Sequence, residues 1–592
     1  MSNSFATKHL SPISRLGNWW RILLTIFALG LPQTAAQAAL KITLVGLNKA
    51  QHDNVQLYLS LQPASPPKSE VHLRRQFRQA PEEIRKALQA LGYYQPEITS
   101  DLIQHGKDWE AHFTIQTGEP VRITLIDLNI EAAPGATDPA IEKLRLAFPL
   151  HLNDVLNHGQ YTQGKHDWQV FAEERGYFDA KFTLQRVTVD PVKHSAEVHL
   201  HYALGTRYQL GAVIFRQRGY KADYLARFVL FKPDEPYHAS RLLELRTRLE
   251  NSDQFSSVEV NARREHAKNH NIPVEVTLTK RPKFKFNTGI GYGTDTGPRI
   301  SLGWENRRIN SAGHRFSSAL TLSSISSGAS ALYSIPLRDP AREHLEFQAS
   351  GLDESTDTSD SRTLTLGARI TTVRAGNWLE TMFINAQQES FQVGNDSGKA
   401  RLLLPGINWT RTRNRNSAYL QSGDRLFFEA KGSDTWLGSD TRFFQAQTQG
   451  KLIKALNSKS RVLLRLDLGA SVVGTFSELP ASQRFFAGGD HSVRGYAYES
   501  LGPKDAEGIV TGGRYLVVGS LEYERRILNK WSVAAFYDIG NALDTFTDPL
   551  KHSAGFGVRW QTPVGPVRID LASALDEPGR PLRLHLYFGP DL

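Results

Sequence analysis

The sequence contains no cysteine, and it lacks the repeated apolar runs of a polytopic helical membrane protein. Without cysteine, disulfide bonds, thiolate zinc sites and cysteine nucleophiles are excluded. Each membrane-spanning helix would need about 20 consecutive apolar residues, yet only 40% of the 592 residues are hydrophobic. This composition leaves a transmembrane β-barrel open, because lipid-facing and lumen-facing side chains alternate there and average out.

Motifs of catalysis and cofactor binding are also missing. The 19 histidines show no metal-ligand spacing, and no nucleophile elbow marks a catalytic serine. Gly289, Gly291 and Gly293 have the spacing of a phosphate loop, but neither a helix nor a Lys-Ser/Thr sequence follows them. A net charge of +10 is too mild over this length to indicate nucleic-acid binding. We therefore expect no enzyme, no cofactor, no metal site and no nucleic-acid partner.

The N-terminus has the three parts of a secretory signal peptide. Basic residues precede the apolar run Ile22–Leu31, and the small-residue site Ala36-Gln37-Ala38 follows it. This pattern predicts a signal peptide over residues 1–38 with cleavage after Ala38. An uncleaved membrane anchor is the alternative, and both interpretations imply export from the cytoplasm.

The next 240 residues repeat one pattern three times. Each repeat has an alternating apolar strand, helical stretches, a turn that carries an aromatic residue, and two more strands. This β-α-α-β-β order places a helix pair on a small sheet. We expect the turn aromatics Tyr94, Phe178 and Phe255 to fill the cores. We also expect an exposed sheet edge that accepts another chain by β-augmentation. The predicted units span residues 39–118, 119–205 and 206–281.

From residue 282 to residue 592 the helical periodicity stops and sixteen short alternating segments follow. The first is Phe284–Tyr292, the last is Leu582–Phe588, and Leu402–Thr410 is typical of those between. In the last segment Leu582, Leu584, Leu586 and Phe588 lie on one face, and Arg583, His585 and Tyr587 lie on the other. Such segments predict a 16-stranded transmembrane barrel that closes by pairing its last strand with its first. A soluble β-sandwich would also alternate, but the signal peptide and the even strand count favour the barrel.

One connection, between Ala470 and Tyr515, is more than forty residues long. Connections of this length are usually functional or disordered, and this one is too apolar and glycine-patterned for plain disorder. Its Arg494 lies between small and aromatic neighbours. Glu522 and Asp538, in the next two strands, are predicted to face the lumen. We expect these carboxylates to hold the arginine inside the barrel; a solvated surface arginine is the alternative.

These motifs resemble those of the outer-membrane assembly superfamily, whose small repeated units are called POTRA domains. The loop-six motif of that family matches Val493, Arg494, Gly495 and Tyr496. Its Phe-x-Asp-x-Gly strand motif matches residues 536–540, and Glu522 fits the acidic position one strand earlier. The resemblance implies three POTRA domains before an outer-membrane barrel, with Arg494 fixed by Glu522 and Asp538. The POTRA domains would lie in the periplasm.

Three POTRA units and this length are most similar to the TamA family, the barrel subunits of the translocation and assembly module. That resemblance implies an inner-membrane-anchored partner of the TamB type, and client outer-membrane proteins such as autotransporters. Two other functions stay open: a two-partner-secretion-type pore for one dedicated exported protein, and an outer-membrane enzyme such as a lipase.

The closing seam of the barrel is predicted to be labile. The first strand carries Gly289, Gly291 and Gly293, and glycine weakens a strand. The last strand, with Leu584, Leu586 and Phe588, is short, and Pro590 follows it. A weak seam would lend a strand edge to an incoming client strand within the lipid. The alternative is that these glycines only make room for packed side chains.

Overall fold

The computed structural model describes residues 40–62, 69–133, 138–414, 420–562 and 565–588. The predicted signal peptide, residues 1–38, lies outside this range. The described chain forms two compact bodies, one that ends at Tyr208 and one that begins at Gln209. Within the described ranges, no helix combines the length and apolar character that a bilayer crossing requires.

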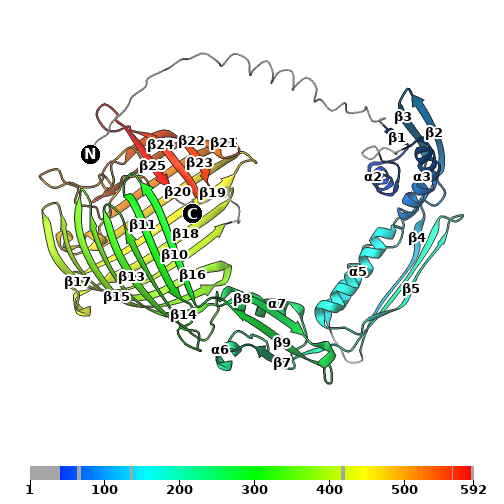
Figure 1. The fold of residues 1–592 in the computed structure, drawn as a ribbon, viewed down its shortest axis with the longest axis horizontal. Helices are drawn as coiled ribbons and strands as arrows, with labels where there is room; N and C mark the ends of the chain where they lie inside the picture. Colours follow the sequence, from blue (N-terminus) through cyan, green and yellow to red (C-terminus); the bar gives the residue numbers. More distant parts are fainter. Residues whose placement is uncertain (1–39, 63–68, 134–137, 415–419, 563–564, 589–592) are drawn as a thin grey trace, which may run out of the picture. The chain divides into compact units, whose positions relative to one another are not determined.

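Three small units of the predicted β-α-α-β-β order precede a barrel (Figure 1). The first unit contains β1 (Leu40–Val45), α2 (Lys49–Tyr58), α3 (Glu70–Ala90), β2 (Glu97–His105) and β3 (Asp108–Gln116). The second contains β4 (Arg122–Ala132), α4 (Pro139–Leu146), α5 (His158–Arg175), β5 (Lys181–Asp190) and β6 (Ser195–Gly205). The third contains β7 (Gln209–Arg216), α6 (Ala222–Ala226), α7 (Ala239–Asn251), β8 (Phe255–Ala262) and β9 (Asn271–Lys280).

Each small sheet has its third strand in the centre, in the orders β1-β3-β2, β4-β6-β5 and β7-β9-β8. The first strand of each unit pairs parallel with the third, and the second pairs antiparallel with it. Parallel pairing requires a long crossover, which the helices and the second strand supply. The outer strands, such as β2 and β5, are therefore edges.

The prediction for the turn aromatics is right for Phe255 and wrong for Tyr94 and Phe178. Phe255 is buried in the third unit. Tyr94 is half-buried and packs against the core of the second unit, where its hydroxyl lies 2.6 Å from His158 Nε2. Phe178 is half-buried and makes an edge contact with Tyr208. In these two repeats the preceding aromatic residue, Tyr93 or Tyr177, packs into the core of its own unit. The predicted residue therefore contacts the neighbouring segment instead.

The barrel closes with sixteen strands, as predicted, and runs from green to red in Figure 1. Its first eight strands are β10 (Phe284–Gly293), β11 (Gly297–Asn306), β12 (Arg315–Leu322), β13 (Ser326–Pro336), β14 (Glu343–Ser355), β15 (Ser359–Arg374), β16 (Trp378–Val393) and β17 (Asp396–Asn414). The other eight are β18 (Gly423–Ser433), β19 (Phe443–Ala455), β20 (Ser460–Val473), β21 (Tyr515–Leu528), β22 (Trp531–Leu543), β23 (Lys551–Thr562), β24 (Gly565–Ala574) and β25 (Leu582–Phe588). Every strand pairs antiparallel with its neighbours.

Several strands extend beyond their predicted bounds. The alternation predicts Leu402–Thr410, whereas β17 runs from Asp396 to Asn414. The alternating pattern identifies only the part of a strand whose outward side chains are apolar. The hydrogen bonds between strands need only backbone groups, so they continue through polar residues. The predicted faces hold in β25, where Leu582 and Leu584 are exposed on the outside and His585 is buried inside.

The third unit is docked on the barrel through a buried ion pair. Arg248, on α7, is 6% exposed and donates both terminal nitrogens to the carboxylate of Asp339, which lies between β13 and β14, at 2.6 and 3.1 Å. Its Nε donates to the carbonyl of Phe228. Gly313 has a φ of +80°, and a Cβ there would lie 2.4 Å from the ring of Tyr224. The third unit therefore has a fixed seat on the barrel.

Replacing Asp339 with alanine should loosen this seat. The buried Arg248 guanidinium would lose its carboxylate, at a cost of about 2–3 kcal/mol. Hydrogen exchange should then accelerate in α7 on the order of 30- to 150-fold. The matched control is Glu250→Ala, which removes the exposed Arg246–Glu250 pair on the same helix and should leave exchange unchanged. Equal exchange in the two variants would show that the ion pair does not hold the unit.

Candidate functional site

The long connection between β20 and β21, residues 474–514, is folded against the inner wall of the barrel, and we call it the lumen loop. It contains the short 3₁₀ turns η4 (Phe476–Glu478) and η5 (Ala481–Gln483). Its apolar side chains are buried in two clusters, one with residues of β16 and β17 and one with residues of β21 and β24. The loop is thus an ordered part of the core.

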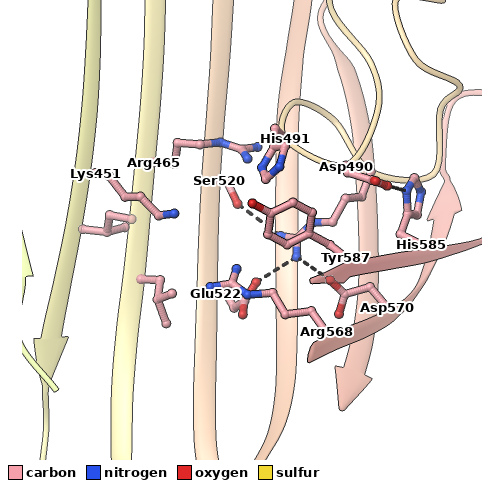
Figure 2. Close-up of a pocket in the computed structure, with 13 residues that line it drawn as sticks. Lys451, Arg465, Asp490, His491, Ser520, Glu522, Arg568, Asp570, His585 and Tyr587 are labelled. Atoms are coloured by element: carbon pink, nitrogen blue, oxygen red, sulfur yellow. Dashed lines mark hydrogen bonds and ion pairs between the residues drawn. The ribbon is translucent and has the colours of Figure 1, made fainter. Parts of the chain in front are cut away.

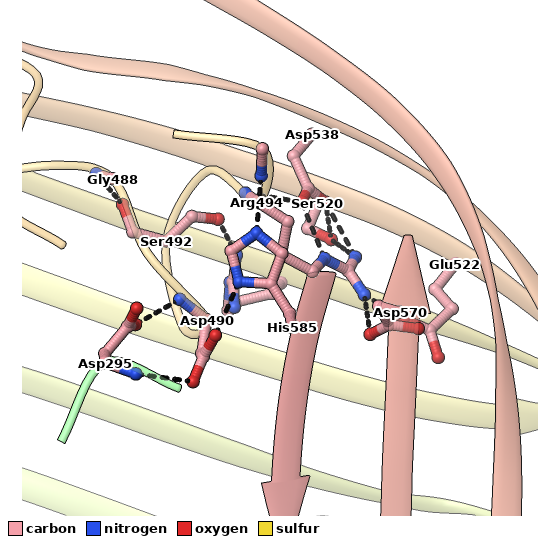
Figure 3. A network of polar contacts seen from close by, with 12 residues as sticks. Asp295, Gly488, Asp490, Ser492, Arg494, Ser520, Glu522, Asp538, Asp570 and His585 are labelled. Atoms are coloured by element: carbon pink, nitrogen blue, oxygen red, sulfur yellow. Dashed lines mark hydrogen bonds and ion pairs between the residues drawn. The ribbon is translucent and has the colours of Figure 1, made fainter. Parts of the chain in front are cut away.

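Arg494, in this loop, is held by carboxylates from the wall (Figure 3). Its Nε and Nη2 each donate to the carboxylate of Asp538 at 2.8 Å, which makes a bidentate pair. Its Nη1 donates to Glu522 Oε2 at 2.8 Å. The Arg494 side chain is 6% exposed. The structure thus brings together the three residues that the sequence singles out.

The strand pattern explains how both carboxylates face the lumen. On β21, Leu521 and Tyr523 are exposed on the outside, so Glu522 between them points inward. Asp538 lies on β22, directly opposite Ser520 of β21, whose hydroxyl donates to it at 2.6 Å. The ring of Phe536, two residues before Asp538, lies 3.4 Å from Arg494 Cζ. The guanidinium therefore has charge partners at its edge and an aromatic face beneath it.

Two further members of the network, Asp570 and Arg559, are not predicted from the sequence. Asp570 of β24 accepts from Arg494 Nη1 at 3.1 Å. Arg559 of β23 bridges Glu522 at 2.8 Å and Asp570 at 2.5 Å. Gly557 makes room for them, because a Cβ there would lie 1.8 Å from Asp570 Oδ1. Alternation places both side chains inside the barrel, but only the strand register brings them to Arg494.

The network keeps Arg494 charged despite its burial. Burial alone would lower the pKa of Arg494, but the carboxylates of Asp538, Glu522 and Asp570 outweigh it and raise the pKa above its usual range. Val493 and Tyr496, on either side, are buried in the apolar cluster with Val518. Gly495 has a φ of +91°, and a Cβ there would lie 3.1 Å from the backbone of β24. Each position of the four-residue motif therefore has a packing or pairing role.

The lumen loop is also anchored on the opposite part of the wall. Ser482 donates its backbone N–H and its hydroxyl to the buried Glu389 of β16. Arg484 donates to Asp396 of β17 at 3.0 Å. Glu499 accepts from two threonine hydroxyls in the turn between β14 and β15. The loop is therefore tied to the wall on several sides.

A small cavity lies beside the Arg494 network (Figure 2). It has a volume of about 50 Å³ and is lined by charged side chains, among them Lys451, Arg465 and Arg568. A cavity of this size holds a few waters at most. A second cavity, of about 490 Å³, is also lined by Lys451 and Arg465, so this charged cluster borders open space on its other side.

The seam is the junction of β10 with β25. Within the described residues, Gly293↔Tyr587 is the one pair in register between these strands. At the next position the Thr294 N–H donates to the carbonyl of Leu586, and the Leu586 N–H donates to the Thr294 hydroxyl oxygen at 2.6 Å. By contrast, β10 pairs along its whole length with β11.

The predicted seam residues have different surroundings. Gly293 lies in the seam pair, and a Cβ on Gly291 would lie 3.8 Å from the carbonyl of Phe588. Gly289 faces Ser301 of β11 instead, because a Cβ on Gly289 would lie 2.5 Å from the Ser301 hydroxyl. The last-strand residues are in register with β24, in the pairs Leu584↔Leu571, Leu586↔Ile569 and Phe588↔Val567.

Replacing Asp538 with asparagine should destabilise the barrel. The change leaves a buried guanidinium short of one charge partner, which costs about 3–5 kcal/mol. We expect the heat-induced mobility shift of the folded barrel on gels to occur at a lower temperature. The exposed Arg362–Asp353 pair supplies the control, because Asp353→Asn should cost less than about 1 kcal/mol. Arg494→Lys, which keeps the charge but loses the bidentate geometry, should fall between them. Identical melting of Asp538→Asn and the control would contradict the assignment.

Comparison with known proteins supports the architecture. The outer membrane protein assembly factor BamA of Neorickettsia risticii is 23% identical over 394 residues, which are 60% of this chain and 51% of that protein. BamA of Neisseria meningitidis serogroup B is 21% identical over 580 residues, 84% of this chain and 70% of that protein. The chain thus spans about half the length of the Neorickettsia relative.

Among solved structures, BamA from Haemophilus ducreyi lacking POTRA domains 1–3 has a similar fold. Its TM-score is 0.65 at 16% identity, and the match covers 78% of this chain and 99% of that one. Residues 41–117 match the family described as "POTRA domain TamA domain 1". The Omp85 superfamily domain matches residues 283–589, more than half of the chain. The chain therefore belongs to the Omp85 superfamily, and its outer-membrane β-barrel is preceded by periplasmic POTRA domains.

Proposed function

We propose that this protein is a TamA-type barrel subunit of a translocation and assembly module, which assists the insertion of outer-membrane proteins such as autotransporters. The observation that carries the proposal is the seam, where β10 and β25 share one residue pair in register among the residues that the structure describes. The match of the first unit to TamA domain 1 supports the TamA type. A TamB-like inner-membrane-anchored protein is the proposed partner, bound at an exposed edge of a POTRA sheet.

The physical argument concerns unpaired backbone groups in lipid. Each unsatisfied N–H or C=O in a bilayer costs several kcal/mol. Between Phe284 and Tyr292, β10 has no register partner on its seam side among the described residues. An incoming client strand would satisfy those groups by pairing with β10. Client insertion is therefore favourable at this edge and at no fully paired position of the wall.

The lumen loop favours lateral insertion over transport through the lumen. A secretion pore for one dedicated protein would require the loop to leave the lumen, which breaks the contacts of Arg494, Arg484 and Ser482 with the wall. Two of these are ion pairs in which the arginine side chain is buried, with exposures of 0% and 6%, and leaving a buried guanidinium without its partner is costly. Opening of the seam leaves these contacts in place.

A disulfide across the seam should block insertion. The chain has no native cysteine, so Gly293→Cys with Tyr587→Cys introduces one defined pair at register partners. With the protein in lipid vesicles, oxidation should abolish the protease protection of a client autotransporter barrel, and a reductant should restore it.

The matched control joins Ile569→Cys to Leu586→Cys, which are register partners of the fully paired β24 and β25. Oxidation of this pair should leave client insertion unchanged, because β25 stays free to separate from β10. Insertion that continues through an oxidised seam would refute lateral gating. Copurification of a large secreted protein, instead of an inner-membrane-anchored one, would favour the dedicated pore.

A further inference from the structure

His585, on the last strand, joins that strand to the lumen loop. Its side chain is 3% exposed. Its Nδ1 lies 2.5 Å from Asp490 Oδ1, and the backbone N–H of Gly495 donates to its Nε2 at 2.8 Å. The ring of His491 also packs edge-on against Tyr587 of the same strand, with centroids 4.4 Å apart. The loop that carries Arg494 therefore holds β25 directly.

Asp490 continues this connection to the other side of the seam (Figure 3). Its backbone N–H donates to the carboxylate of Asp295, in the turn between β10 and β11, at 2.5 Å. The N–H of Asp295 points back to Asp490 Oδ2 at 3.4 Å. A Cβ on the preceding Gly489 would lie 2.5 Å from Asp295 Oδ2, so this close approach requires glycine. A chain of side-chain contacts thus crosses from the first hairpin to the last strand.

The three side chains are spaced closely enough to hold a metal ion, but the hydrogen bonds around His585 oppose it. The Gly495 N–H can only donate, so Nε2 of His585 must accept. Nδ1 of the neutral ring then carries the proton that it donates to Asp490. This tautomer leaves Nδ1 without a lone pair for a metal. The contacts are therefore those of a hydrogen-bonded link.

We propose that Asp295, Asp490 and His585 form a latch, in which the lumen loop holds the last strand against the first hairpin and sets how readily the seam opens. The inference rests on the proposed function only for the role of seam opening, which is client insertion. His585 and Asp490 are positioning residues that act through the position of β25. Asp570, which contacts Arg494, is the register partner of His585, so the arginine network and the latch are adjacent.

The latch should depend on pH through Asp295. Burial and the nearby Asp490 carboxylate raise the pKa of Asp295 to about 6. The groups that face it are Asp490 and Tyr498 of the loop, and Arg583 and His585 of β25. A raised pKa means that the protonated form favours the closed state. Asp295 therefore stabilises the closed latch at low pH. This stabilisation is lost as the pH rises through about 6, because two charged carboxylates, Asp295 and Asp490, then lie side by side.

Hydrogen exchange at the amides of Thr294 and Leu586 tests the latch, because these groups carry the backbone contact across the seam. In the full chain in nanodiscs, His585→Ala should accelerate their exchange about tenfold or more. Asp490→Asn keeps the size of the side chain and serves as the test if His585→Ala does not fold. It should also accelerate exchange of these two amides, by a smaller factor. The control is His552→Ala, which removes a half-buried histidine side chain that bonds Tyr537 away from the seam and should leave the exchange of both amides unchanged.

Two further arms separate the latch from other roles. After correction for the intrinsic exchange rate, protection in the wild type should fall as the pH rises through about 6, and Asp295→Asn should abolish that step. Added Zn²⁺ should have no effect. Unchanged exchange in His585→Ala, a persistent pH step in Asp295→Asn, or His585-dependent protection by Zn²⁺ would each overturn the proposal. No client is present in this assay, so its result is independent of whether the protein inserts clients.

Discussion

The buried charge of Arg494 is the constraint on which the rest of the barrel depends. A guanidinium with 6% of its side chain exposed is tolerated only where carboxylates meet it with good geometry. Those carboxylates come from three strands, β21, β22 and β24. The loop therefore cannot adopt its position before these strands are in register. Without the loop, Asp538 would lose its bidentate partner, and Glu522 and Asp570 would keep only Arg559. Barrel closure and loop folding are thus coupled.

This coupling explains why the wall near β21–β24 differs from the seam. Around most of the barrel, continuous backbone ladders join the strands. At the seam, the described part of the chain has one register pair, and contacts from the lumen loop supply further links between the two sides. Backbone hydrogen bonds between strands therefore hold most of the barrel wall together. Side-chain contacts from the lumen loop hold the seam, where the described backbone pairing is sparse.

The sequence predicts the elements better than the contacts between them. Alternation finds the sixteen strands and their inner faces, and so it places Glu522 and Asp538 inside the barrel with Arg494. It does not find Arg559 or Asp570, because their meeting depends on a register that no single strand encodes. The repeats show the same limit. The pattern locates an aromatic turn in each unit, but whether Tyr94 enters its own core or the next unit's depends on how neighbouring units meet.

A seam held by side chains opens differently from one held by a ladder. Separating two fully paired strands in lipid exposes backbone groups at every step, each at a cost of several kcal/mol. At this seam most of the β10 backbone has no register partner on that side among the described residues, so opening would expose few additional groups of that part of the chain. The barrier then resides in polar contacts such as Asp490 to His585, inside the lumen and apart from the lipid. On the proposed function, a protein built this way would open or stay closed through a few polar side chains, while the rest of its wall stays paired.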